Sequence, residues 1–150
     1  MRDVIQKWYA WLKQATLSEK APSEKQELAH VYSDGRQLWA TDGYRLHARQ
    51  VATGKQGRVT LDEAGLFQVS ANGRLPDFAA SLPQSEPAVT VVVERDRLLQ
   101  ALAGQDRQVR LTLYAADQAV ELSSAGAYAL VMPLIGMEEA DFWRPETSGD

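Results

Sequence analysis

The sequence contains no cysteine, and only two of its 150 residues are histidine. The lack of cysteine excludes disulfide bonds, thiolate zinc sites and a cysteine nucleophile, and it is typical of the cytoplasm, which is the expected location. No apolar run approaches the roughly 20 residues that a membrane helix requires, and the charged N-terminal stretch is unlike a signal peptide. A net charge of −4 does not indicate a generic nucleic-acid binder, so the positions of individual basic residues decide that question.

What is present is an ordinary globular composition, with 45% hydrophobic and 24% charged residues. A chain of this length suits one domain, which buries enough surface to fold without disulfides or metals. We predict a single domain over residues 1–135 and a loose tail over residues 136–150, where Phe142 and Trp143 are candidates for docking on the domain.

Apolar residues at helical spacing predict an amphipathic helix from Arg2 to about Lys20, ended by Pro22. We interpret Trp8 and Trp11 as core anchors of this helix rather than as a binding surface. Basic residues on its polar face are Arg2, Lys13 and Lys20.

Short strand-like segments and turn signals fill most of the remaining chain. Strands are predicted at residues 28–32, 37–40, 44–51, 58–61, 66–70, 88–93, 109–114, 119–123 and 128–134. Asp34-Gly35 and Asp42-Gly43 mark turns, and a second helix is predicted over residues 95–103. The proline-rich connection at residues 72–87 is expected to cross and pack on the body. This order predicts an α+β fold, with two helices packed on two antiparallel sheets and an internal pseudo-repeat.

Three motifs in this order resemble the bacterial DNA polymerase III sliding-clamp family. Residues 40–46, ATDGYRL, are similar to the family's ATDGHRL stretch, with Tyr44 in place of histidine. Residues 73–78, GRLPDF, with the following Leu-Pro, are similar to the family's GRFPDY…LP segment, and residues 131–134, VMPL, resemble the end of its last domain. The resemblance covers about residues 1–135 and implies a DNA-clamp-like domain. A family ring contains six such domains, so this chain implies a sixfold homo-oligomer or an incomplete assembly.

The resemblance also implies two binding sites. In the family, the helices face duplex DNA, and the residues here that would contact the phosphates are Arg2, Lys13, Lys20, Arg97 and Arg107. The family's hydrophobic cleft for short linear peptides of polymerases and repair proteins would be lined by Thr41, Gly43, Tyr44, Arg45, Leu46, Pro83, Leu130 and Met132. The alternatives are a solvated helix face for the first site, and a turn with ordinary core residues for the second.

Signatures of catalysis are scarce. His30 and His47 lack metal-ligand spacing, and no glycine-rich phosphate loop is present. Asp34 and Asp42 lie in turn signals that explain them. We therefore expect a non-catalytic protein without a cofactor or metal: a sliding-clamp-like accessory factor of DNA replication, a processivity or tethering protein. The main alternative is a protein-interaction module that does not bind DNA, and an enzyme is the least favoured.

Overall fold

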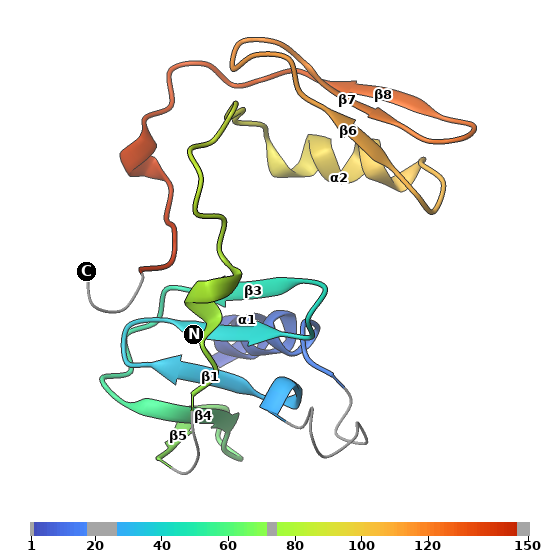
Figure 1. Ribbon diagram of the computed structural model, residues 1–150. Helices are drawn as coiled ribbons and strands as arrows, with labels where there is room; N and C mark the ends of the chain where they lie inside the picture. The colour runs from blue at the N-terminus through green and yellow to red at the C-terminus, as the bar shows by residue number, and fades with distance from the viewer. Residues whose placement is uncertain (1, 18–26, 72–74, 147–150) are drawn as a thin grey trace. The chain divides into compact units, whose positions relative to one another are not determined.

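The computed structural model describes residues 2–17, 27–71 and 75–146 (Figure 1). It divides into two compact units, Met1–Leu82 with Trp143–Asp150, and Pro83–Phe142. We call them the first and the second unit. Each contains a helix and an antiparallel sheet, so the predicted α+β class is confirmed. The single domain and the clamp-like pseudo-repeat stay predictions.

The first unit has one helix and a five-stranded sheet. Their bounds are α1 Arg2–Lys13, β1 Val31–Asp34, β2 Leu38–Thr41, β3 Leu46–Arg49, β4 Gln56–Leu61 and β5 Phe67–Ser70. The strands lie in the order β3-β2-β1-β4-β5, and all neighbours are antiparallel. The strands predicted at residues 58–61 and 66–70 are thereby confirmed as β4 and β5, which pair as a hairpin.

Helix α1 ends at Lys13, so the predicted extension toward Lys20 is wrong for residues 14–17. The Lys13 carbonyl accepts hydrogen bonds from both the Thr16 amide (3.1 Å) and the Thr16 hydroxyl (2.7 Å). These bonds tighten the last turn and occupy a carbonyl that a longer helix would use. Leu17 then donates its amide to the Leu28 carbonyl, which draws the chain away from the helix axis.

The two faces of this sheet carry different cores, because successive side chains of a strand point to opposite faces. On one face, α1 buries Leu12 and Ala15 against the sheet, where Val31, Leu38, Ala40 and Val59 are buried with them. The other face buries Tyr32 and Trp39 beneath Phe78 of the connection, with Leu75 and Leu82 packed around them. The predicted packing of the connection on the body is confirmed for residues 75–82.

The interpretation of Trp8 and Trp11 as core anchors is wrong. Trp11 is 41% exposed and Trp8 is half-buried, whereas Leu12 and Ala15 are fully buried. The core under α1 is formed by small and aliphatic sheet residues, and the two indoles lie at its margin beside the edge strand β3. Helical spacing indicates which residues share an apolar stripe, but it does not identify which of them lie at the centre of the core.

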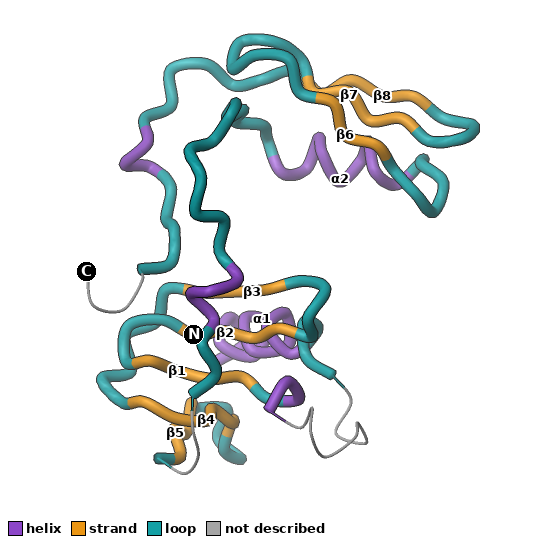
Figure 2. Tube along the Cα trace, viewed as in Figure 1, coloured by secondary structure: helices purple, strands orange, loops and turns teal. Residues whose placement is uncertain are grey.

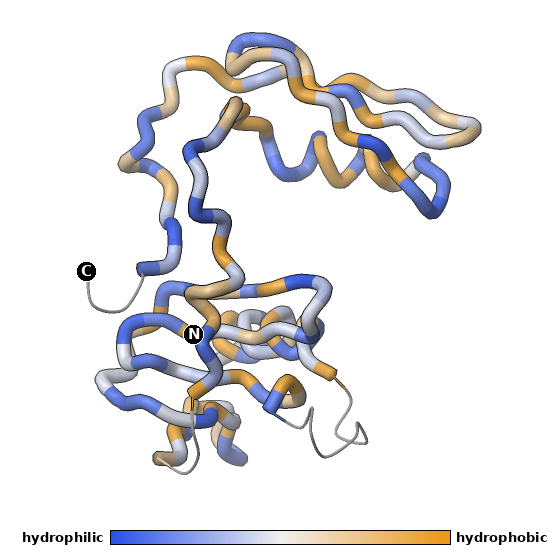
Figure 3. Tube along the Cα trace, in the orientation of Figure 1, coloured by the Kyte–Doolittle hydropathy of each residue, from blue (hydrophilic) through white to orange (hydrophobic). Residues whose placement is uncertain are grey.

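The second unit has helix α2 Arg95–Ala103 and strands β6 Arg110–Thr112, β7 Val120–Ser123 and β8 Tyr128–Val131, in the order β6-β7-β8 (Figure 2). The predicted bounds of α2 are confirmed. Its small core is formed by Val120, Leu122 and Val131, with apolar residues of α2 and of the segment before it packed alongside. Figure 3 shows how apolar and polar residues are interspersed along α2.

The predicted strand over residues 88–93 is wrong, since the structure places none of these residues in a sheet. Val91 and Val93 pack on the core of the second unit, and the Val92 carbonyl accepts one hydrogen bond, from the Leu134 amide at 2.7 Å. A run of β-branched residues indicates a half-buried, extended backbone, but it does not show that a neighbouring strand is present to form a sheet.

Both units follow the same local order, a helix and then a three-stranded meander. Helix α1 precedes β1, β2 and β3 and contacts β2 and β3, while α2 precedes β6, β7 and β8 and contacts β8. The β4–β5 hairpin extends only the first sheet, at the β1 edge.

Candidate functional site

The turn between β2 and β3 is built by its own side chains. The Asp42 carboxylate accepts hydrogen bonds from the backbone amides of Tyr44 (2.9 Å) and Arg45 (3.1 Å). The Thr41 hydroxyl accepts from the Gly43 amide and donates to the Arg45 carbonyl. Gly43 has φ +92°, which glycine adopts most readily. The predicted turn is confirmed, and it leaves Tyr44 96% exposed.

The hydrogen bond from the Tyr44 amide, with Arg45 nearby, holds the pKa of Asp42 below its ordinary value of 3.8. A carboxyl group whose pKa is lower in the folded protein than in the unfolded protein stabilises the fold at pH values above its unfolded-state pKa. This stabilisation is lost as the pH falls through the folded-state pKa. We expect Asp42→Ala to lower the free energy of unfolding by about 1–2 kcal/mol at neutral pH, because two amides lose their acceptor.

Asp42→Asn is the matched control, since it keeps the acceptor oxygen of the two amides and removes the charge together with the contact from Arg45 Nε. We expect Asp42→Asn to lower the free energy of unfolding less than Asp42→Ala does at neutral pH. The difference in this free energy between Asp42→Asn and the parent should shrink below about pH 4. Urea unfolding at several pH values measures both. A difference between Asp42→Asn and the parent that is constant down to about pH 2 would contradict a stabilising role of this charge.

A ladder of three side-chain contacts joins α1 to β3 and the turn before it. Arg49 places its guanidinium 4.1 Å from the centroid of the Trp8 ring. His47 stacks on Trp11 at 4.1 Å, and its Nδ1 lies 2.7 Å from the Trp11 carbonyl. Arg45 donates to the Gln14 carbonyl. The contacting residues are Trp8, Trp11 and Gln14, three positions apart along α1 and the turn after it, and Arg49, His47 and Arg45, two positions apart along β3 and the turn before it. These spacings place each set on one face of its element.

The eight residues predicted for the peptide cleft divide between the two units. Thr41, Gly43, Tyr44, Arg45 and Leu46 belong to the first unit, and Pro83, Leu130 and Met132 to the second. Leu46 packs on the cluster of Tyr32, Trp39 and Phe78, as the alternative of an ordinary core residue predicts. Leu130 and Met132 are instead 53% and 62% exposed, so they are not core residues of their unit.

In the second unit, Leu130 and Met132 border a shallow groove of about 510 Å³ that runs beside α2 along the edge strand β8. Alternation directs the Leu130 side chain to the sheet face opposite the core that contains Val131. Arg97 and Gln100 of α2 form its opposite side. The structure thus brings Arg97, predicted for DNA, beside two residues predicted for the peptide. An apolar strip with an adjacent cation suits a partner segment that has both apolar and acidic side chains.

The outer face of the second sheet carries a polar cluster that sequence reasoning missed. Glu121 of β7 interacts with the hydroxyls of Tyr114 and Tyr128. Its hydrogen bond and charge raise the pKa of Tyr114, and partial desolvation with the same carboxylate raises the pKa of Tyr128. Both rings are more than half exposed. Alternation of the strand residues was the available signal, because it places Glu121, Tyr128 and Leu130 on one face.

The residues predicted to contact DNA differ in the exposure of their side chains and in the polar contacts that they already make. Arg97 and Arg107 are exposed, and Arg97 Nε lies 3.6 Å from the Glu94 carboxylate. Lys13 is half-buried and donates from Nζ to the Ala29 carbonyl at 3.2 Å. Arg2 is the first residue of α1, but its side chain, like the whole of Lys20, lies outside the described residues. Among the described side chains predicted to contact DNA, those of Arg97 and Arg107 are therefore more accessible than that of Lys13.

Other classes of site find little support in the described ranges. Among these residues, no group of three histidine, aspartate or glutamate side chains is placed to hold a metal ion. Nor does any helix formed by them have the length and apolar character needed to cross a membrane. Asp34 and Asp42 both accept from backbone amides of their own turns, as predicted.

Comparison with protein-family models, with curated proteins and with solved structures finds no match for this chain.

Proposed function

We propose that this protein is a non-catalytic, sliding-clamp-like accessory factor that contacts the backbone of duplex DNA and tethers partner proteins through short peptides. The exposure of Leu130 and Met132 beside Arg97, in the groove that runs beside α2 along β8, carries the proposal. Exposed apolar side chains along a groove are costly in water unless a partner covers them. The helix-and-meander order of both units is compatible with the clamp-like arrangement that the three motifs suggest.

A fluorescein-labelled clamp-binding peptide tests the groove by fluorescence anisotropy. We expect Met132→Ala to weaken peptide binding about tenfold, because the thioether side chain supplies adaptable apolar contact. Leu113→Ala is the control, since Leu113 is also exposed but does not line the groove. Equal affinity of the parent and Met132→Ala would exclude this groove as the peptide site.

Charge reversal tests the DNA contact. We expect Lys13→Glu combined with Arg97→Glu to weaken binding to duplex DNA at low salt by about tenfold or more, because phosphate contacts dominate such binding. Lys55→Glu, an exposed change in a loop of the first unit, is the control. Thermal unfolding must first show that the double variant is folded, since Lys13 also bonds the Ala29 carbonyl. A folded double variant with parental affinity would contradict the assignment.

The second candidate is a protein-interaction module that does not bind DNA. It is favoured by the contacts that two of the basic side chains already make within the protein. Lys13 donates to the Ala29 carbonyl and Arg97 lies near the Glu94 carboxylate, so both are less available to phosphates. Peptide binding without DNA binding identifies this candidate. Size-exclusion chromatography with light scattering tests the homo-oligomer: a six-subunit mass supports a ring, and a monomer at high concentration excludes it.

A further inference from the structure

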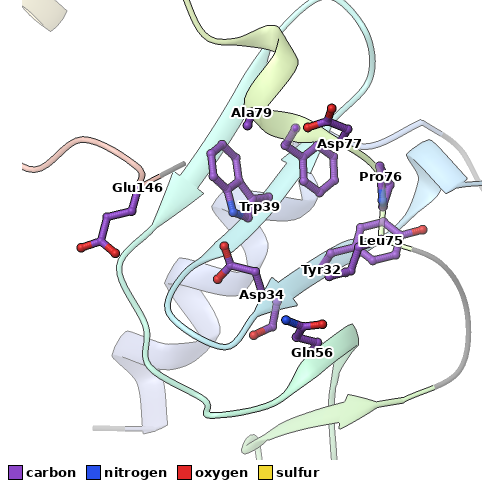
Figure 4. Close-up of a pocket in the computed structure, with 11 residues that line it drawn as sticks. Tyr32, Asp34, Trp39, Gln56, Leu75, Pro76, Asp77, Ala79 and Glu146 are labelled. Atoms are coloured by element: carbon purple, nitrogen blue, oxygen red, sulfur yellow. The ribbon is translucent and has the colours of Figure 1, made fainter. Parts of the chain in front are cut away.

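The two sides of the first sheet differ in the aromatic surface that they leave exposed. On the side shown in Figure 4, Tyr32 and Trp39 are only 5% and 3% exposed beneath Phe78, so their rings belong to the core and offer no surface to a ligand. On the side that α1 covers, Trp11 is 41% exposed. A large apolar ring with this exposure is accessible to a binding partner.

The exposed indole of Trp11 is held in one orientation by β3. The His47 ring stacks on it with centroids 4.1 Å apart and an angle of 8° between the planes, and His47 Nδ1 lies 2.7 Å from the Trp11 carbonyl. Because His47 covers one face of the indole, the exposed part is the opposite face and the ring edge. A flat ring can stack there at little cost for ordering the indole, since β3 already fixes it.

Charge is distributed unevenly along this chain. The sequence has 20 acidic and 16 basic residues, yet residues 4–17 and 43–61 contain no aspartate or glutamate and hold two and four lysines and arginines, respectively. These ranges include α1 from its third residue onward and the whole of β3, and the two elements are in contact. The surface where α1 meets β3 therefore has a positive local field, although the net charge is −4.

Two cations flank the exposed indole. Lys7 lies four residues before Trp11, which places it on the same side of α1, and Arg49 reaches α1 from β3. Both are exposed, and neither forms an ion pair with any residue that the structure describes. Arg45 lies on the same surface but pairs with Asp42 at 3.2 Å, so it is less accessible to a ligand. An exposed ring between two such cations is complementary to a ligand in which flat bases alternate with anionic phosphates.

We propose that the surface formed by Lys7, Trp11 and Arg49 binds single-stranded nucleic acid. One base stacks on the free face of the Trp11 indole, and the neighbouring phosphates contact Lys7 and Arg49. A duplex cannot use the indole, because its bases are stacked on one another. The proposal goes beyond the proposed duplex contact, whose five candidate residues include none of these three.

A fluorescein-labelled oligothymidylate of about 12 nucleotides is the probe, titrated with the intact protein at about 50 mM salt and followed by fluorescence anisotropy. We expect saturable binding that Trp11→Ala weakens about tenfold, because the stacked base loses its platform. Trp143→Ala is the matched control, since this indole is 38% exposed and lies outside α1 and β3. The control should bind the oligonucleotide as the parent does, and Trp11→Ala should leave the affinity for a duplex unchanged.

Two charge variants test the phosphate contacts. We expect Arg49→Gln, and separately Lys7→Gln, to weaken the oligothymidylate about threefold to fivefold. Each should also reduce the slope of log affinity against log salt by about 0.7, the contribution of one phosphate of a single strand. Arg95→Gln removes the same charge from an exposed position in the second unit, and it should change neither quantity.

Circular dichroism first establishes that each variant is folded. No binding of the oligothymidylate by the parent, or parental affinity in folded Trp11→Ala, would overturn the proposal. Equally tight binding of a labelled glutamate peptide of the same length would identify a site for acidic polypeptides and overturn it too. If Trp11→Ala does not fold, unchanged salt slopes in Lys7→Gln and Arg49→Gln decide against the proposal. Binding of the duplex without the oligothymidylate contradicts only this inference, and the reverse result contradicts only the duplex contact.

Discussion

Replacing Gly57 by alanine is expected to lower the free energy of unfolding by about 3–5 kcal/mol, which is near the upper end for a single substitution. Gly57 lies in β4 with φ +149°, and a Cβ there would lie 1.8 Å from the Ser70 carbonyl oxygen and 2.7 Å from its carbon. Both atoms belong to the backbone of β5, and β4 is held on its other side by β1. The strand cannot move away without losing one of its two ladders.

Alanine substitutions at two other glycines distinguish the free-energy cost of the steric clash at Gly57 from the cost of a left-handed backbone conformation. Gly54 has φ +71°, and no heavy atom of the described chain lies within 4 Å of a Cβ built there, so Gly54→Ala should cost about 1–2 kcal/mol. Gly104 has neither a left-handed φ nor such a neighbour, so Gly104→Ala should change stability by about 0.5 kcal/mol or less.

Urea unfolding followed by tryptophan fluorescence measures the series, because all four tryptophans belong to the first unit, which contains Gly57. Gly104 lies in the second unit, so its variant is followed by circular dichroism. If Gly57→Ala proves as stable as Gly54→Ala, the close approach of β4 and β5 is wrong.

The second large effect is expected at Leu12, the buried anchor of α1. Leu12→Ala should lower the free energy of unfolding by about 2–5 kcal/mol, since the side chain is fully buried among Val31, Leu38 and Val59. Trp11→Ala should cost only about 1 kcal/mol, because Trp11 is 41% exposed and loses chiefly its stack on His47.

The comparison is internally matched, because both substitutions introduce alanine at adjacent positions of one helix and gain similar helix propensity. Urea unfolding monitored by circular dichroism avoids the lost indole signal. A Trp11→Ala variant that is destabilised as much as Leu12→Ala would restore the original interpretation of Trp11 as a core anchor.

Features fixed by a few neighbouring residues were predictable from the sequence. Asp34 and Asp42 form turns because each carboxylate accepts from amides two and three residues onward. Helix α2 begins and ends at the residues predicted from the sequence, and Gly104 follows its last residue. The β4–β5 hairpin follows from alternation on either side of Asp62, whose carboxylate accepts from the Leu66 amide.

Features that depend on distant partners were not predictable. The chain leaves the axis of α1 because the Leu17 amide bonds the Leu28 carbonyl, 11 residues further on. The hydrogen bond from the Gln37 side chain to the Glu146 carbonyl joins two residues 109 positions apart, whose contact no local pattern encodes. Leu46 and Leu130 have the same apolar character in the sequence, yet one packs on a core cluster and the other is exposed. Tertiary packing, and not residue type, decides which of them is available to a partner.

The affinity for duplex DNA at two salt concentrations tests the central functional claim most directly. With the intact protein and a short fluorescent duplex, we predict weak, sequence-independent binding at about 50 mM salt that falls at least about tenfold by about 200 mM, as phosphate contacts by a few basic side chains require. Folded protein that shows no binding at the lower concentration, or an affinity that is insensitive to salt, would contradict the account.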